Sequence, residues 1–378
     1  MSVTVNVRSV LRDYRLPADF KAELERLFQD NVDRVHSRTR VTSKPLSMKT
    51  QLYRIQKICR SFVELREHGY ALQSPYSLKQ KHVQALVDLW AKNKLSGGTI
   101  ENKLTYFRAL AEWMRKPNLV GTLGDYVDRA THDLVRSYVA SEDKSWEGNG
   151  IDPLKKLAEI AQTDLHVAVQ LKLQVAFGLR VEESFLLRPV ESMHEDGQLR
   201  VTRGTKGGRD RVVPIGDNFP VLEEAAKLSN PVSKSTIPLG FTKQQWKDRF
   251  YRVLRKHGVR KDDLGVTAHG LRHQFLQGMY ERLTGVEAPI KQSGQRATKE
   301  LHKEAMQRVV EAAGHSRATK ANAYLSTYTV QRAKKSSAVT REQAQQAVLH
   351  ANGVKSYAAA NLGISRQALY RILASTSA

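Results

Sequence analysis

The feature that most restricts the possible folds of this sequence is a glycine-rich turn between two short runs of β-branched residues. The rest of the chain has helical periodicity. The segment QLRVTRGTKGGRDRVVPI, residues 198–215, contains both runs and the turn, which is the pattern of a β-hairpin. On both sides of it, apolar residues recur at the three- and four-residue spacing of amphipathic helices. We therefore expect a mainly α-helical protein with one small hairpin, which makes the region around the hairpin an α+β domain.

The helical pattern also suggests where the domains begin and end. Amphipathic helices are predicted within 18–35, 49–69, 77–93 and 96–117, and the last of them stops at Pro117. A basic, polar stretch, HSRTRVTSKPLS, covers residues 36–47. We expect a basic N-terminal arm with one helix at 1–47, a compact helical domain at 48–120, a linker at 121–135, the hairpin-containing domain at 136–335 and a separate small unit at 336–378.

The charge balance points to a polyanionic partner. Lys and Arg number 61 against 38 Asp and Glu, which gives a formal net charge of +23 and a pI of about 10.0. Binding such a protein to phosphates releases counterions, and 40% hydrophobic residues are still available for folded cores. A folded nucleic-acid-binding protein is the favoured reading, and a basic protein without a specific partner is the alternative.

Cysteine content and hydropathy suggest the compartment. Cys59 is the one cysteine of the chain, so an intramolecular disulfide is impossible and a reducing interior is the natural setting. The N-terminus has no apolar signal-peptide core, and no run of about 20 apolar residues occurs. We expect a cytoplasmic protein associated with the nucleoid and not with a membrane.

Four short pieces of the hairpin-containing domain carry an unusual set of chemically capable side chains. FGLRVEESFLLRP holds Arg180 and Glu183, and the hairpin turn holds Lys206. TAHGLRHQF contains two histidines, a glycine and an arginine at a predicted helix start, and AAGHSRATKANAYLSTY contains a histidine and two tyrosines. The residues of interest in the last two pieces are His269, Arg272, His315 and Tyr324.

These residue types suit phosphoryl transfer without a metal ion. Attack on a DNA phosphodiester puts extra negative charge on the two non-bridging oxygens of the phosphate. Arg180 and Arg272 can bind these oxygens, because a guanidinium offers paired donors that remain charged. The hydroxyl of Tyr324 can serve as a nucleophile that keeps the phosphate in a covalent intermediate. Lys206 on its hairpin can protonate the departing 5′-oxygen, and the imidazole of His269 can accept the tyrosine proton.

The set resembles the tyrosine recombinase family of the phage-integrase type. The family pattern is an Arg box with a following Glu, a hairpin Lys, an H-x-x-R, a second His or Trp, and a Tyr about nine residues later. All six positions are filled in order here, with Tyr324 nine residues after His315. The resemblance covers roughly residues 48–335, because the helical domain before the hairpin is similar to the family's SAM-like core-binding domain.

The resemblance implies a function and a role for each matching residue. It implies a site-specific recombinase, or integrase, that encloses double-stranded DNA between two domains and cleaves and rejoins strands through a 3′-phosphotyrosyl intermediate. It implies no metal or other cofactor, and a homo-oligomer, expected to be a tetramer, on DNA. The implied activating residues are Arg180, Lys206, His269, Arg272 and His315, with Tyr324 as nucleophile and Glu183 as their buttress.

One stretch departs from the compact members of that family. Between Arg272 and His315 lies a polar insertion near TGVEAPIKQSGQRATKE, which we expect to form a lengthened loop between two catalytic helices. In this respect the chain looks closest to the integrase-like proteins of mobile elements that carry such an insertion.

Other interpretations of single pieces are weaker. His269 and His273 have the spacing of two helical metal ligands, but no Glu follows the first His. RGTKGG is similar to a phosphate-binding loop but lacks the G-K-[ST] ending. Tyr328 is a rival nucleophile, expected on the same helical face as Tyr324, and packing is the role we favour for it.

The C-terminal segment KSYAAANLGISRQALYRIL, residues 355–373, has the spacing of a helix-turn-helix. Gly363 falls at the turn and Ser365 can cap the second helix. The segment resembles the Fis-type helix-turn-helix, although a plain helical hairpin packed on a neighbouring subunit is the alternative. The residues expected to face a DNA groove are Arg366, Gln367, Tyr370 and Arg371.

Two functions remain as alternatives to the recombinase. A non-catalytic DNA-binding regulator could have the same fold and bind DNA through the C-terminal helix-turn-helix. The intact set of six catalytic residues argues against this alternative. A topoisomerase or telomere resolvase would use the same chemistry on one duplex. The separate arm-like segments favour recombination over relaxation of a single duplex.

Overall fold

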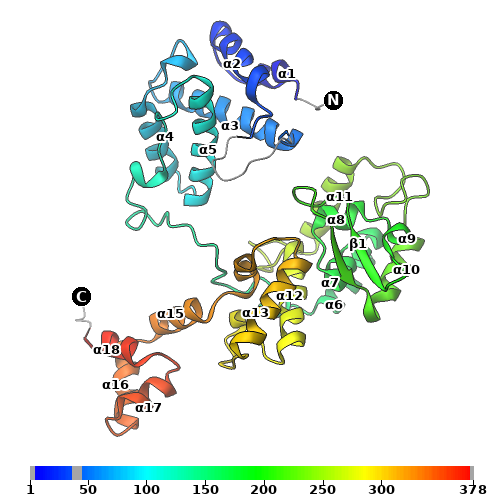
Figure 1. Ribbon diagram of the computed structural model, residues 1–378, viewed down its shortest axis with the longest axis vertical. Coiled ribbons are helices and arrows are strands. Elements are labelled where there is room, and N and C mark those ends of the chain that lie inside the picture. The colour runs from blue at the N-terminus through cyan, green and yellow to red at the C-terminus, as the bar shows by residue number, and fades with distance from the viewer. Residues whose placement is uncertain (1–4, 36–44, 375–378) are drawn as a thin grey trace. The chain divides into compact units, whose positions relative to one another are not determined.

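The computed structural model describes residues 5–35 and 45–374, and the chain divides into two compact units that meet between Ser137 and Tyr138. Most elements are helices, and one two-stranded antiparallel sheet accompanies them (Figure 1). The expectation of a mainly helical protein with a single hairpin is confirmed. Within the described ranges, no helix is both long and apolar enough to cross a membrane.

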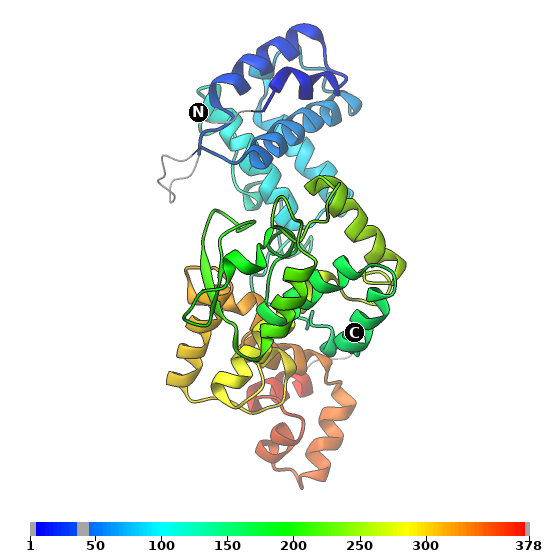
Figure 2. The same cartoon turned by 90° about the vertical axis from the view of Figure 1, so that its right-hand side faces the viewer.

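In its described residues, the N-terminal unit is a bundle of five helices, grouped together in both ribbon views (Figure 2). Its helices are α1 (Val7–Arg12), α2 (Ala18–Asn31), α3 (Met48–Glu67), α4 (Gln80–Lys92) and α5 (Gly97–Trp113), with 3₁₀ turns at Pro75–Ser77 and Leu123–Asp125. Ser47 and Ser96 begin α3 and α5 by accepting hydrogen bonds from the backbone N–H groups of Thr50 and Thr99.

Two boundaries drawn from the sequence differ from this unit. Residues 1–47 were expected to be a basic arm with one helix. The helix is present as α2, but Val7 and Phe20 from α1 and α2 lie in the same hydrophobic core as Phe62, because their apolar faces pair with α3 and α5. Most of the basic stretch 36–47 lies outside the described residues. The predicted linker at 121–135 is also packed, since Leu123 and Leu134 are buried in that core.

The second unit begins with helices and then forms the hairpin. Its first helices are α6 (Pro153–Ala161), α7 (Leu165–Phe177), α8 (Val181–Leu186) and α9 (Pro189–Ser192), after a 3₁₀ turn at Glu147–Asn149. Strands β1 (Gln198–Val201) and β2 (Arg211–Pro214) pair antiparallel, with Leu199 opposite Val213 and Val201 opposite Arg211. The turn between them carries Lys206.

Further helices follow the hairpin and precede the C-terminal segment. They are α10 (Phe219–Lys227), α11 (Lys243–Lys256), α12 (Ala268–Thr284), α13 (Lys299–Ala312), α14 (Asn322–Leu325) and α15 (Tyr328–Ala338), with 3₁₀ turns at Gly216–Asn218, Pro289–Lys291 and Ala318–Ala321. Helix α7 contacts α6, α8, α10 and α12. Its sequence is apolar on nearly every side, as expected of a central buried helix.

The polar insertion lies between α12 and α13, as predicted, and includes the turn at Pro289–Lys291. It is anchored to the core, because Ala288 and Ile290 are buried with residues of α12 and α13. The insertion is therefore attached to the core beside the helices that carry the candidate site.

The last helices form a small core of their own. They are α16 (Arg341–His350), α17 (Lys355–Asn361) and α18 (Arg366–Ala374) (Figure 1). Ala344, Ala358, Ile364 and Leu369 are buried together in a cluster that draws only on residues of this segment. Such a cluster lets the three helices hold together without apolar support from the core around α7.

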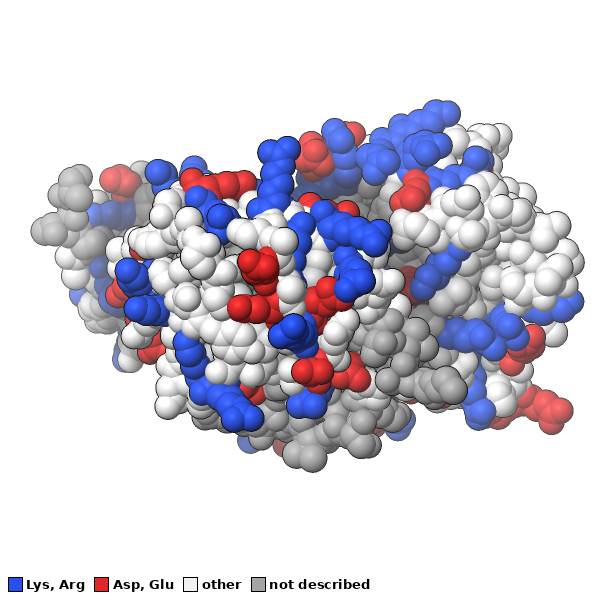
Figure 3. All heavy atoms as spheres, turned by 90° about the horizontal axis from the view of Figure 1, so that it is seen from above, with Lys and Arg blue, Asp and Glu red and all other residues white. Residues whose placement is uncertain are grey.

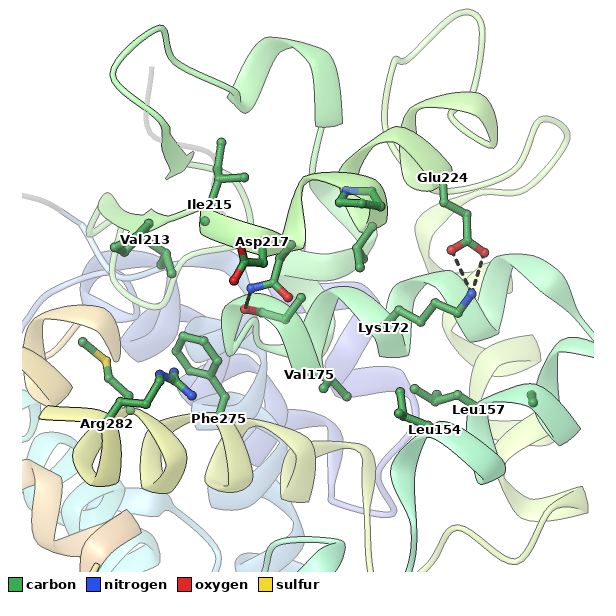
Figure 4. A pocket seen from close by; sticks show the side chains of 18 of the residues that line it. Leu154, Leu157, Lys172, Val175, Val213, Ile215, Asp217, Glu224, Phe275 and Arg282 are labelled. Carbon is green, nitrogen blue, oxygen red and sulfur yellow. Dashed lines mark hydrogen bonds and ion pairs between the residues drawn. The ribbon is translucent and has the colours of Figure 1, made fainter. Parts of the chain in front are cut away.

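An apolar hollow of about 940 Å³ lies among α6, α7, α10 and α12, beside the end of β2 (Figure 4). Leu154, Val175 and Phe275 line it, and the ion pair between Lys172 and Glu224 spans part of its wall. None of the predicted site residues contributes to its lining. Outside this hollow, Lys and Arg side chains are spread with Asp and Glu among them over the face drawn in Figure 3.

Candidate active site

At the start of α8, an arginine is hydrogen-bonded to a buried carboxylate. Arg180 is the residue before the helix, and Glu183 accepts hydrogen bonds from its backbone N–H and from its Nη1, both at 2.6 Å. Glu183 is fully buried. The structure places Arg180 and Glu183 together, and the carboxylate also caps the helix by accepting one of its free N–H groups.

A second arginine, which the sequence analysis missed, completes this cluster. Arg211 at the start of β2 donates from Nη1 and Nη2 to the two oxygens of Glu183, both at 2.7 Å. Burial alone would raise the pKa of Glu183, but bonds and charge from Arg211, and then from Arg180, lower it to about 2. Glu183 is therefore ionised and joins the hairpin to α8.

The hairpin turn approaches the same helix. Gly204 has a positive φ of 71°, and a Cβ there would lie 2.7 Å from the carbonyl oxygen of Glu182. Only glycine fits this approach. Lys206, two residues on, is exposed on the turn, and its charge is near enough to His315 to lower the pKa of that imidazole.

Arg272 occupies the centre of the site on α12. Its side chain is fully buried, and its Nη1 and Nη2 donate to the backbone carbonyl oxygens of Gly178 and Ala313. The Ala313 oxygen also accepts from Nη2 of Arg180 at 2.8 Å. Two arginines from distant parts of the sequence are thus held by one carbonyl. Gly178 is required beside them, because a Cβ there would lie 2.4 Å from the ring of Phe275.

Tyr324 places its hydroxyl between a guanidinium and an imidazole. Its Oη lies 3.4 Å from Nε of Arg272 and 3.4 Å from Nε2 of His315. The ring centroids of His269 and His315 lie at similar distances from that of Tyr324, 6.5 and 6.2 Å. His269 was expected to accept the tyrosine proton, whereas His315 is the imidazole that hydrogen-bonds the Tyr324 hydroxyl in this structure.

The imidazoles of the site are held in the neutral form at neutral pH. Loss of contact with water, followed by the charges of nearby arginines, lowers the pKa of His315 to about 4. The same causes lower the pKa of His269 to about 4, although part of its side chain is exposed. A neutral imidazole can accept a proton.

Comparisons with known proteins agree with this geometry. Residues 149–278 match the family model described as "Integrase", and residues 40–120 match "Phage integrase, N-terminal". The chain is 32% identical over 144 residues to the tyrosine recombinase XerA of Pyrococcus horikoshii, and 34% identical over 141 residues to that of Pyrococcus furiosus. These alignments cover 37% and 35% of the chain, and 48% and 47% of the relatives.

The chain belongs to the phage integrase family of tyrosine recombinases. It spans about half the length of the curated XerA relatives that it matches. The crystal structure of a lambda integrase (75–356) dimer bound to a COC′ core site shares the fold, with a TM-score of 0.53 at 14% identity over 81% of this chain and 95% of that one.

The family match and the site overlap only in part. The segment matching "Integrase" contains Arg180, Lys206, His269 and Arg272, whereas His315 and Tyr324 follow it in the chain. The geometry of the last two residues is therefore supplied by the structure, which brings their side chains to within hydrogen-bonding distance of one another.

Tyr328 does not share a helical face with Tyr324 in this integrase-family chain, contrary to the expectation from their spacing. Ser326 lies between them with φ 64° and ψ −165°, a backbone region almost restricted to glycine. It ends α14, and α15 then starts in a new direction at Tyr328. The Tyr328 ring packs beside His302 and Arg296, which fits the packing role favoured for it.

The C-terminal helices have the local features of the predicted helix-turn-helix. Gly363 has a positive φ of 62° at the turn, and Ser365 caps α18 by accepting from the backbone N–H of Ala368 at 3.1 Å. The four residues expected to face DNA, Arg366, Gln367, Tyr370 and Arg371, are all exposed. Similarity to a Fis-type module remains a prediction.

In the described part of the chain, no group of three or more His, Cys, Asp or Glu side chains is placed to hold a metal ion. The rings of His269 and His273 lie 5.3 Å apart edge to face. His273 instead packs its ring 4.9 Å from that of Tyr324. It is a further residue of the site that the sequence analysis considered only as a metal ligand.

Proposed function

We propose that this protein is a site-specific DNA recombinase, an integrase, that cleaves and rejoins DNA strands through a 3′-phosphotyrosyl intermediate. The observation that carries the proposal is the hydroxyl of Tyr324, which lies at 3.4 Å from both Arg272 and His315. A nucleophile, a charged clamp and a proton acceptor are thereby within reach of one phosphate.

The chemistry proceeds by in-line attack. Tyr324 Oη forms a bond to the phosphorus of a DNA phosphodiester, and its proton passes to the neutral His315. The bond from phosphorus to the 5′-oxygen breaks, and Lys206 on the hairpin turn protonates that oxygen. Arg180 and Arg272 bind the non-bridging oxygens as charge builds on them. Attack by a 5′-hydroxyl from another strand reverses these steps and frees Tyr324.

The site must open for this reaction. Tyr324 is only 6% exposed and Arg272 is fully buried, whereas the Arg180 side chain retains 17% exposure. An incoming phosphate therefore meets Arg180 first and replaces the Tyr324 hydroxyl on Arg272 as the Tyr324 side chain rotates, while the backbone of α14 stays in place.

The DNA partner and the assembly follow from the same chemistry. Exchange between two duplexes requires four strands to be cut, and each protomer supplies one Tyr324. The active assembly is therefore a homotetramer on double-stranded DNA at the nucleoid, with the N-terminal helical unit as the core-binding domain and α16–α18 as an accessory DNA reader.

The test uses duplexes nicked near candidate sites, so that the released fragment diffuses away and the covalent adduct accumulates. The wild-type chain is expected to form an adduct on a denaturing gel, also with excess EDTA, because the arginines supply the charge. Tyr324→Phe should bind equally well and form no adduct.

Tyr328→Phe is the matched control and should still form the adduct. An adduct that survives Tyr324→Phe, or that disappears only with Tyr328→Phe, would identify a different nucleophile. Binding without any adduct from the wild-type chain would favour the regulator, and relaxation of one supercoiled duplex without strand exchange would favour the topoisomerase.

A further inference from the structure

The first residues of the second unit form a strap, which we define as residues 138–149, along the helices of the candidate site. The backbone N–H of Ala140 donates to the carbonyl oxygen of Asn322 in α14 at 2.9 Å. At the other end, Nε1 of Trp146 donates to the carbonyl oxygen of Thr267, which begins α12, at 2.8 Å. The strap therefore touches both the helix of Arg272 and the short helix of Tyr324.

One buried side chain connects the strap to the backbone of the nucleophile. Gln277 on α12 is 1% exposed, and its Nε2 donates to Oδ1 of Asp143 at 2.9 Å and to the carbonyl oxygen of Tyr324 at 3.3 Å. Asp143 is itself held, because the same oxygen accepts from the backbone N–H of Ser145 at 2.9 Å. A single amide group thus joins strap, α12 and α14.

Helix α14 depends on such outside contacts. It has only four residues and ends at Ser326 in its left-handed conformation, and one helical turn is not stable by itself. A shift of its backbone moves the Tyr324 hydroxyl directly, because the side chain projects from that turn. A misplacement of about 1 Å can lower a rate by roughly a hundredfold.

The neighbouring turn of α12 provides an internal comparison. Gln274 also joins α12 to the strap, since its Nε2 donates to Oε1 of Glu147 at 2.8 Å and its Oε1 accepts from the Glu147 backbone at 3.3 Å. These bonds end on the strap, whereas those of Gln277 continue to Tyr324. The two glutamines therefore separate attachment of the strap from placement of the nucleophile.

We propose that Gln277 is a positioning residue for strand cleavage, which fixes the backbone of Tyr324 against the strap through Asp143. This inference rests on the proposed recombinase function. It assigns Gln277 and Asp143 to the alignment of the Tyr324 hydroxyl with Arg272 and His315, and to no contact with DNA.

The test measures single-turnover adduct formation on a nicked duplex at saturating protein, together with duplex binding and thermal unfolding. Gln277→Leu keeps most of the volume and loses both donors. We expect at least a tenfold slower adduct formation with binding within twofold of wild type, since only placement is lost. Gln274→Leu, the matched control, should react within about twofold of wild type.

A second series of variants changes Asp143, whose side chain is only half-buried. Asp143→Asn keeps an oxygen acceptor for Gln277 and should retain the wild-type rate, whereas Asp143→Leu should be slowed like Gln277→Leu. The double variant should be no slower than either single variant, because both changes break one connection.

Normal rates for Gln277→Leu and Asp143→Leu, or equal losses in Gln274→Leu, would overturn the inference and leave the recombinase function intact. Equal losses of binding and folding with no change in the saturated rate would assign the glutamine a structural role only. Absence of any adduct from the wild-type chain would instead overturn the proposed function, and this inference with it.

Discussion

At the scale of single residues, one carboxylate organises the arginines of the candidate site. Glu183 is fully buried and accepts from Arg180 and from both terminal nitrogens of Arg211. A buried charge is costly unless it is paired with good geometry, and here the geometry is bidentate. Glu183 thereby orients Arg180 while Arg211 neutralises its charge.

Arg211→Met should therefore lower the free energy of unfolding of the second unit by about 3 kcal/mol, because it leaves Glu183 buried with one partner fewer. Thermal or urea unfolding measures the loss. Lys172→Met, at the partly exposed pair with Glu224, is the control and should cost about 0–1 kcal/mol. Equal losses in the free energy of unfolding at both positions would show that burial does not make the Glu183–Arg211 pair more important for stability.

Arg272 is expected to matter to the reaction more than to DNA affinity. Arg272→Ala should lower adduct formation by roughly a hundredfold or more, the scale for losing a donor to the transition state. Duplex binding should change little, because many other phosphate contacts hold the DNA. Arg272→Lys should also be impaired, since one ammonium cannot span the Gly178 and Ala313 carbonyls as the guanidinium does.

Mobility shifts and denaturing gels run on the same samples separate these effects. Near-normal adduct formation by Arg272→Lys would show that charge alone suffices and that the paired geometry is unimportant. A parallel loss of binding in both variants would place Arg272 among the residues that hold the duplex.

At the scale of elements, α16–α18 are the part of the second unit that can be removed with least disturbance. Their buried residues pack on one another, so a chain ending after Thr340 keeps the helices of the candidate site. The exposed side chains of Arg366 and Arg371 lie on α18, the helix expected to enter a groove.

Removing residues 341–378 should weaken binding to long DNA and reduce its salt dependence, while adduct formation on a short nicked site persists. In the full chain, Arg366→Ala or Arg371→Ala should each lower the slope of log affinity against log salt by about 1 if the side chain binds a phosphate. Titrations at several salt concentrations measure both. Unchanged affinity on every DNA length would favour the helical hairpin that packs on a neighbouring subunit.

At the scale of the whole molecule, the neutral imidazoles of the site should make stability depend on pH. The pKa values of His269, His273 and His315 are lowered to about 4, 3 and 4, first of all by loss of contact with water. In the unfolded chain, histidine titrates near 6.5. Between these values the unfolded state binds more protons, so stability is full above about pH 6.5 and falls as the pH drops towards 4.

Thermal unfolding between pH 7.5 and pH 5 tests this expectation. The melting temperature of the second unit should fall over that range, and His273→Gln should make the fall shallower because one of the titrating groups is gone. A melting temperature that is flat from pH 7.5 to pH 5 would contradict the assignment.

The sequence predicted the part of the site that depends on residue type and order. Arg180, Arg272, His315 and Tyr324 were identified in this way, and the structure brings them together across some 140 residues of chain. Tyr328 was misplaced because helical spacing does not foresee a backbone break such as Ser326. Residues 1–47 were expected to form a basic arm with one helix, because burial of α1 and α2 in the core depends on long-range packing.

Arg211 was missed although the sequence contained a usable signal. In RVVPI it alternates in phase with Val213 and Ile215, so a strand that buries those two residues also buries the arginine. A buried guanidinium requires an acid, and Glu183 follows the first arginine of the pattern. Gln277 gave no comparable signal, because its importance comes from the strap that lies against it.

The shared carbonyl of Ala313 has a consequence for any survey of variants. The Ala313 oxygen accepts hydrogen bonds from both Arg180 and Arg272. No amino-acid substitution removes a backbone oxygen, so mutational scanning cannot test this shared contact directly. The next residue, Gly314, has φ 62°, and a Cβ there would lie 3.4 Å from Arg211. A substitution at this glycine would strain the backbone that presents the Ala313 oxygen, so a disturbed acceptor is expected to show itself at a position that has no functional group.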